Sequence, residues 1–130
     1  MGRKISYLLD TNVLVRFLVG DNPQQLAQAK EWFGQAQEGR HRITISSLIV
    51  AESCFVLESF YHIARVEIVE KLQVFLGQRW LNIPRRKILL GVWPYYLKNF
   101  HFVDAYLVSR AKIEKTKILT FDVKLKKQLA

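Results

Sequence analysis

Short runs of apolar, strand-forming residues alternate along this chain with longer stretches in which apolar residues recur at helical spacing. Three such runs lie at residues 5–9, at residues 43–45 and from residue 118 onward, and a weaker one at residues 81–83 ends before Pro84. Successive runs are separated by far more than the dozen residues that a crossover connection needs. The chain is therefore constrained to an α/β fold with a mainly parallel sheet.

The intervening stretches predict helices over residues 13–20, 23–37, 48–60, 65–76, 85–97 and 102–114, with a short basic helix after residue 122. Pro23 is typical of a helix start, Ser46 offers an N-cap, and Pro94 is expected to kink or break the helix that contains it. We expect a three-layer sandwich in which helices cover both faces of a central sheet of about four to five strands. Residues 1–130 are expected to form one domain.

Charge is the one unusual feature of the composition. The chain has 20 Lys and Arg residues against 11 Asp and Glu residues, a formal net charge of +9, which predicts a polyanionic partner: nucleic acid or an acidic protein surface. A single cysteine, Cys54, forms no internal disulfide and fits a reducing compartment, so we expect a cytoplasmic protein. No apolar run reaches the roughly 18 residues of a membrane span, and we expect no membrane partner.

Four acidic residues lie where a carboxylate is costly to place. Asp10 and Asp122 follow the first and last predicted strands, while Glu52 and Asp104 are expected on the apolar, buried faces of their predicted helices. Ligands of open parallel sheets bind outside the carboxyl ends of the strands. A buried carboxylate needs a cation, and the chain lacks a Cys or His cluster for Zn²⁺, so Mg²⁺ or Mn²⁺ is the predicted ligand.

Each of these acids also has a structural interpretation, as a helix cap or as half of an ion pair. Asp10, in Asp10-Thr11-Asn12, is a good N-cap candidate. Four separate caps in such settings are nevertheless a weaker explanation than one shared site, and a shared metal site is the prediction.

Four short motifs occur in one order along the chain: Asp10-Thr11-Asn12, residues 46–52, Asp104-Ala105 and Thr120-Phe121-Asp122. In this order the sequence resembles the PIN-domain ribonucleases, particularly the VapC-type toxins of prokaryotic toxin-antitoxin pairs. The resemblance implies a PIN-like fold, homodimers and neutralisation by a cognate antitoxin protein. It also implies hydrolysis of RNA that leaves 5′-phosphate and 3′-hydroxyl ends.

The resemblance assigns roles residue by residue. Catalytic and metal-binding roles, for one or two divalent ions, fall on four carboxylates, with Asp10 and Asp104 as the first candidates for direct ligands: Asp10, Glu52, Asp104 and Asp122. Supporting roles fall on Thr11 and Asn12, which would shape the end of the first strand, on Ser46, and on Thr120, which would position Asp122 by a hydrogen bond.

We therefore expect a metal-dependent endoribonuclease whose basic residues hold the RNA backbone. The candidates for RNA contact are Arg85, Arg86, Lys87 and Lys124, with Arg40, Arg42 and residues 112–127 as a wider set. Any one of them is also explained as an ordinary solvated side chain. The aromatic residues within 93–102 either stack on unpaired bases or pack in the core or against a partner.

Three other classes of protein compete with this prediction. A haloacid-dehalogenase-like phosphatase needs a second Asp two residues after the first, and this chain has Asn12; a receiver domain needs paired acids before its phosphorylated Asp, and these are absent. The remaining alternative is a basic module that binds nucleic acid or a partner without catalysis. That alternative predicts that Asp10→Asn leaves function intact and that no divalent ion binds.

Overall fold

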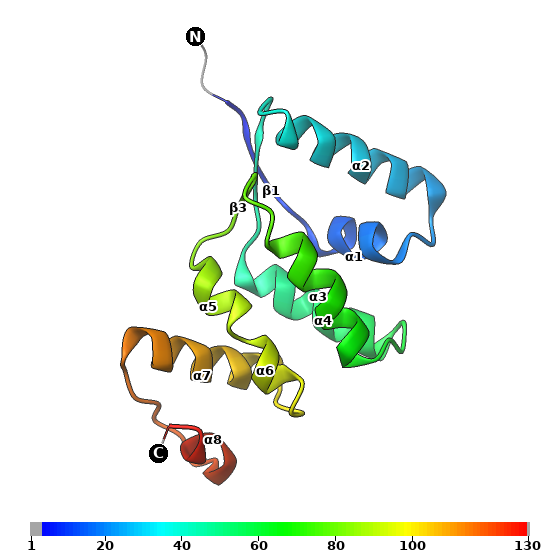
Figure 1. Ribbon diagram of the computed structural model, residues 1–130. Helices are drawn as coiled ribbons and strands as arrows, with labels where there is room; N and C mark the ends of the chain where they lie inside the picture. The colour runs from blue at the N-terminus through cyan, green and yellow to red at the C-terminus, as the bar shows by residue number, and fades with distance from the viewer. Residues whose placement is uncertain (1–3, 130) are drawn as a thin grey trace. The chain divides into compact units, whose positions relative to one another are not determined.

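The computed structural model describes residues 4–129. The chain divides between Pro84 and Arg85 into two compact units, both seen in Figure 1. The first unit holds a small parallel sheet with helices, and the second is helical in its described residues. The expectation of a single domain over residues 1–130 stays a prediction.

The sheet of the first unit is parallel throughout, as predicted. Its strands are β1 (Ser6–Leu8), β2 (Arg42–Thr44) and β3 (Leu81–Asn82), in the order β1-β2-β3. Tyr7 pairs with Ile43, and Ile43 with Leu81. The weak strand before Pro84 is therefore confirmed.

The helices of the first unit have nearly the predicted bounds: α1 (Thr11–Val19), α2 (Pro23–Gln37), α3 (Ser47–Ser59) and α4 (Arg65–Leu76). Local signals explain this agreement. Gly20 ends α1 in the left-handed conformation at φ 72°, Pro23 opens α2, and the Ser46 hydroxyl accepts a hydrogen bond from the Ile49 amide at 3.3 Å. Helix α1 packs against α2 and α3, and α3 packs against α4.

A hydrogen-bond network of three side chains connects α1 and the loop after it to the loop after α3. Arg16 Nη1 donates to Asp21 Oδ2 at 2.9 Å and to the Tyr61 hydroxyl at 3.1 Å, and that hydroxyl donates to Asp21 Oδ2 at 3.0 Å. Desolvation by itself raises the pKa of the Asp21 carboxyl, but the hydrogen bonds from Tyr61 and Arg16 and the charge of Arg16 outweigh it and lower that pKa. The network therefore keeps the Asp21 carboxylate ionised and hydrogen-bonded to Arg16 and Tyr61.

The second unit contains α5 (Arg86–Leu90), α6 (Trp93–Tyr96), α7 (Phe102–Glu114) and α8 (Val123–Lys127). Helix α7 packs against both α5 and α6. The predicted break in the first helical stretch is confirmed, but it falls at Gly91 and Val92 rather than at Pro94. Pro94 lies in the first turn of α6, where its missing N–H costs no hydrogen bond.

The contact of α5 with α7 leaves no room for a side chain at Gly91. A Cβ there would lie 2.5 Å from Ser109 Oγ, which donates a buried hydrogen bond to the Ile88 carbonyl at 2.6 Å. We expect Gly91→Ala to lower the free energy of unfolding by about 1–3 kcal/mol, because the serine must move and its hydrogen bond breaks. Urea denaturation followed by circular dichroism measures this change.

Gly34 in α2 provides the matched control, because a Cβ at that position meets nothing within 4 Å. Gly34→Ala is expected to stabilise the protein by up to about 1 kcal/mol through helix propensity. Ser109→Ala in the Gly91→Ala background is expected to recover part of the loss, since it removes the clashing oxygen. An equal effect of the two glycine substitutions would contradict the close approach.

The prediction of a strand that begins at Ile118 is wrong, because residues 116–121 contain neither strand nor helix. Leu119 and Phe121 are fully exposed, at 102% and 103%. A strand exists only through hydrogen bonds to a neighbouring strand, so an apolar run without such a neighbour stays irregular. The count of four to five strands is therefore not confirmed, and the three-layer arrangement stays a prediction.

Among residues 4–129, every helix is too short or too polar to cross a lipid bilayer.

Candidate functional site

Asp10 joins the carboxyl end of β1 to the start of α1. Its backbone is extended, and its Oδ1 accepts a hydrogen bond from the Thr11 amide at 2.9 Å. The side chain is exposed, and within residues 4–129 its Oδ2 has no hydrogen-bond partner. Asp10 is therefore a helix cap, as its structural interpretation predicted, and still has one oxygen free for a ligand.

Thr11 and Asn12 form the first turn of α1 behind Asp10. Thr11 is buried and gives Asp10 its backbone N–H, while Asn12 is exposed beside it. The two residues thus differ in their relation to Asp10. The Thr11 amide holds one carboxylate oxygen at the helix end, whereas Asn12, like Asp10 itself, is exposed to solvent.

Glu52 lies on α3, the helix that packs against α1. The expectation that it lies on the buried face is wrong: Glu52 is exposed, and so are Leu48 and Phe55, at 81% and 68%. The buried positions of α3 are Val50, Ser53, Cys54 and Leu57. Because α3 is apolar on nearly all sides, hydrophobic spacing does not determine which face packs inward.

Asp104 occupies the first turn of α7 and is half-buried. The backbone N–H groups of a helix start favour a negative charge there. Within residues 4–129 its carboxylate has no side-chain hydrogen bond or ion pair, and the preceding His101 makes no side-chain cap. Its oxygens therefore remain available at the amino end of α7.

Asp122 caps α8 much as Asp10 caps α1. Its Oδ1 accepts from the Leu125 amide at 3.1 Å, and its own amide donates to Thr120 Oγ1 at 3.0 Å. The hydrogen bond expected between Thr120 and Asp122 is thus present in the structure. The side chain is exposed, so its second carboxylate oxygen, like that of Asp10, faces solvent.

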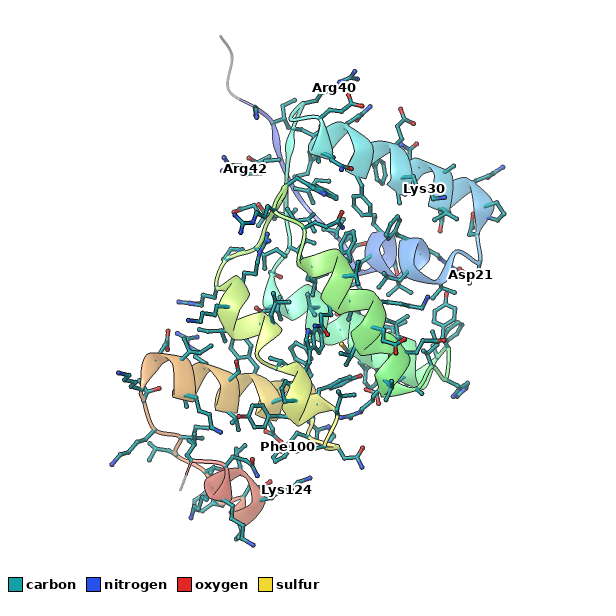
Figure 2. All side chains as sticks on the ribbon, in the orientation of Figure 1. Asp21, Lys30, Arg40, Arg42, Phe100 and Lys124 are labelled. Atoms are coloured by element: carbon teal, nitrogen blue, oxygen red, sulfur yellow. The ribbon has the colours of Figure 1, made fainter. Side chains whose placement is uncertain are left out.

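A cation–π contact links the starts of α7 and α8 within the second unit. Lys124, two residues after Asp122, places its Nζ 4.3 Å from the centroid of the Phe100 ring, and Figure 2 shows these two labelled residues side by side. Phe100 comes four residues before Asp104. The chain segments that carry Asp104 and Asp122 therefore meet at one end of α7.

The structure thus puts Asp10 and Glu52 in the first unit, and Asp104 and Asp122 in the second. Three of the four carboxylates are exposed and the fourth is half-buried, so the argument that burial forces a cation among them is wrong. Within either unit, the described residues contain no group of three or more His, Cys, Asp or Glu side chains that would hold a metal ion.

The sequence model of one family, described as PIN domain, matches residues 7–128. The chain belongs to the PIN domain family. No curated protein and no solved structure gives a significant match. PIN domains are generally nucleases that act on RNA and typically use divalent metal ions.

A pocket of about 330 Å³ opens beside Asp10 in the first unit of this PIN domain. Its lining includes Asp10 together with Tyr7, Trp32 and His41, three side chains that the sequence did not single out. Tyr7 and His41 meet edge to face with ring centroids 5.0 Å apart. Only the pairing of β1 with β2 puts these rings together, so no local sequence signal identifies them.

The aromatic residues of the second unit divide by burial. Trp93, Tyr96 and Phe100 are at most 5% exposed, so of the two interpretations of this patch, base stacking does not apply to these three side chains and core packing does. They contribute to the core of the PIN domain. Tyr95 differs, because it is half-buried and has lysine side chains around it.

The four basic residues named first for RNA contact lie at two places in the second unit. Arg85, Arg86 and Lys87 stand at the start of α5, where Arg85 adopts the left-handed conformation at φ 56°. Lys124 lies on α8, close to Asp122. Arg85, Lys87 and Lys124 are exposed and Arg86 is half-buried. Exposure of this kind suits contact with a phosphate backbone.

Proposed function

We propose that this PIN domain is a metal-dependent endoribonuclease that hydrolyses RNA phosphodiester bonds through Asp10, Glu52, Asp104 and Asp122. Asp10 is the observation that carries the proposal. In a chain of this family it is an exposed carboxylate at the carboxyl end of a parallel strand, with one oxygen fixed by a cap and the other free. Asp122 repeats the cap and the free oxygen at the start of α8, although no strand precedes it.

The donor set fits Mg²⁺ or Mn²⁺, which prefer carboxylate oxygens. Asp10 and Asp122 each offer a free oxygen, Glu52 is exposed, and Asp104 is without a side-chain partner among the described residues. We propose that these four residues hold one or two such ions. When bound, the ion supplies positive charge to the phosphate and lowers the pKa of a water molecule.

The residues of the chain orient this site and hold the substrate. The cap hydrogen bonds fix the Asp10 and Asp122 carboxylates before any ligand binds, which lowers the entropic cost of binding. Thr11 and Asn12 form the first turn of α1 after Asp10, Ser46 caps the helix that carries Glu52, and Thr120 accepts a hydrogen bond from the Asp122 amide. Contact with the RNA backbone is assigned to the exposed basic residues and to one half-buried arginine: Arg85, Arg86, Lys87 and Lys124.

The biological setting is proposed from the resemblance to VapC-type toxins. In that setting the protein is a cytoplasmic toxin that acts as a homodimer and is neutralised by a cognate antitoxin. A net charge of +9 supports both partners, because RNA and an acidic antitoxin segment are polyanions.

A second candidate function, a basic binding module without catalysis, has one specific observation in its favour. That alternative assigns Asp10 and Asp122 to helix capping, and both residues do cap helices in this structure. Capping uses only one oxygen of each carboxylate, however, so it does not exclude catalysis.

Incubation of end-labelled total RNA with the purified protein in Mg²⁺, Mn²⁺ or EDTA tests the proposal. An Asp104→Asn variant purified in the same way controls for contaminating nucleases. We expect cleavage at discrete sites by the wild-type protein with either metal and none in EDTA. Absence of cleavage together with RNA binding that persists in EDTA would overturn the nuclease and favour the binding module.

A further inference from the structure

Three lysines converge on two aromatic rings in the second unit. Lys112 Nζ lies 5.1 Å and Lys98 Nζ 6.0 Å from the centroid of the Tyr95 ring, and Lys124 Nζ lies 4.3 Å from that of Phe100. The two rings meet edge to face with centroids 6.3 Å apart. These five residues, here the lysine–aromatic cluster, come from α6, α7, α8 and the loop after α6.

The charge of the cluster is not neutralised within the described part of the chain. None of Lys98, Lys112 and Lys124 forms an ion pair there, whereas the nearby Arg110 is paired with Glu114 at 2.8 Å. All three ammonium groups are exposed. Like charges held around adjoining rings repel one another, and a polyanion relieves that repulsion.

The rings restrain the lysines before a ligand arrives. A free lysine loses much side-chain entropy when it is fixed on a phosphate, and a cation–π contact removes part of that cost in advance. Phe100 is buried and therefore rigid, and Tyr95 is half-buried. The cluster is thus better organised for binding than an isolated lysine on an open helix face.

The cluster also borders the proposed catalytic acids. Lys124 is two residues from Asp122, and Phe100 is four residues before Asp104. A nucleic acid strand bound to these lysines would lie close to Asp104 and Asp122, the carboxylates proposed to hydrolyse its phosphodiester bonds. This position distinguishes RNA from other polyanions as the occupant.

We infer that Lys98, Lys112 and Lys124, held by Tyr95 and Phe100, bind the phosphate backbone of single-stranded RNA substrate next to Asp104 and Asp122. The inference rests on the proposed function for the identity of the ligand. It assigns the binding energy to backbone phosphates, so affinity depends on salt and little on sequence.

Fluorescence anisotropy with a labelled single-stranded RNA oligonucleotide in EDTA, over a series of KCl concentrations, tests this inference. We expect the K98Q/K112Q/K124Q variant to bind about 10- to 100-fold more weakly than wild type at 0.1 M salt, and its log Kd against log[KCl] slope to fall by about 2. EDTA prevents metal-dependent cleavage, so the result does not depend on whether the protein is a nuclease.

The matched control replaces three exposed lysines of the first unit, K4Q/K30Q/K71Q, which removes the same net charge. We expect the control to change the slope much less. Equal changes in the two variants would overturn the inference, as would RNA binding by K98Q/K112Q/K124Q at wild-type affinity, the result expected if the cluster served an acidic protein instead. Tyr95→Leu is expected to weaken RNA binding severalfold without changing the slope, and an unchanged affinity would contradict the role of the ring.

Discussion

Replacing Asp10 by asparagine is expected to slow RNA cleavage by about a thousandfold while leaving the fold intact. Asparagine caps a helix as well as aspartate does, so the hydrogen bond to the Thr11 amide is kept. The charge that would bind a divalent ion is lost, and metal assistance is worth several kcal/mol of barrier, each 1.36 kcal/mol being tenfold in rate. Single-turnover cleavage of labelled RNA with Mg²⁺ measures the effect.

Asp21→Asn is the matched control, because Asp21 is the one aspartate of this sequence outside the proposed site. It removes the negative charge that pairs with Arg16 but leaves the four carboxylates of the proposed site unchanged. We expect the Asp21→Asn protein to cleave at close to the wild-type rate. Equal rates for Asp10→Asn and wild type, with circular dichroism showing both proteins folded, would reduce Asp10 to a helix cap.

Replacing Leu14 by alanine is expected to lower the free energy of unfolding by about 2–5 kcal/mol. Leu14 is 0% exposed on α1, which packs against helices α2 and α3, so the substitution both loses apolar burial and leaves a cavity. Urea denaturation followed by far-ultraviolet circular dichroism gives the difference from wild type.

Leu48→Ala provides the comparison for this prediction, because Leu48 is 81% exposed and the chemical change is the same. We expect a change within about 0.5 kcal/mol for that variant. A loss of unfolding free energy at Leu48 as large as that at Leu14 would contradict the described packing, in which Leu14 is buried and Leu48 is exposed.

Helix ends were predictable from sequence because their signals are local. Ser46 as a cap and Pro23 as a first residue each depend on a few neighbouring residues, and both act in the structure as expected. The first helix also ends at Gly20, where it was expected to end. The weak strand at Leu81 was also predictable, because Pro84 marks its end.

Features that depend on distant partners were not predictable in the same way. The segment from Ile118 has the composition of a strand but no strand neighbour among the described residues. Glu52 was assigned to the buried face of α3. Helix α3 has apolar residues on nearly every side, so their spacing does not show which face is buried. The acidic motifs themselves were found in sequence, whereas their exposure depends on packing.

The most direct test of the central claim is the binding of Mn²⁺ to the wild-type protein and to the Asp10→Asn and Asp122→Asn variants, followed by electron paramagnetic resonance. These substitutions lie in different units, and each keeps its helix cap. If the four carboxylates hold the metal, the wild type binds Mn²⁺ and each variant binds it at least about tenfold more weakly. Wild-type affinity in both variants, or no Mn²⁺ bound by any of the three proteins, would contradict a carboxylate metal site.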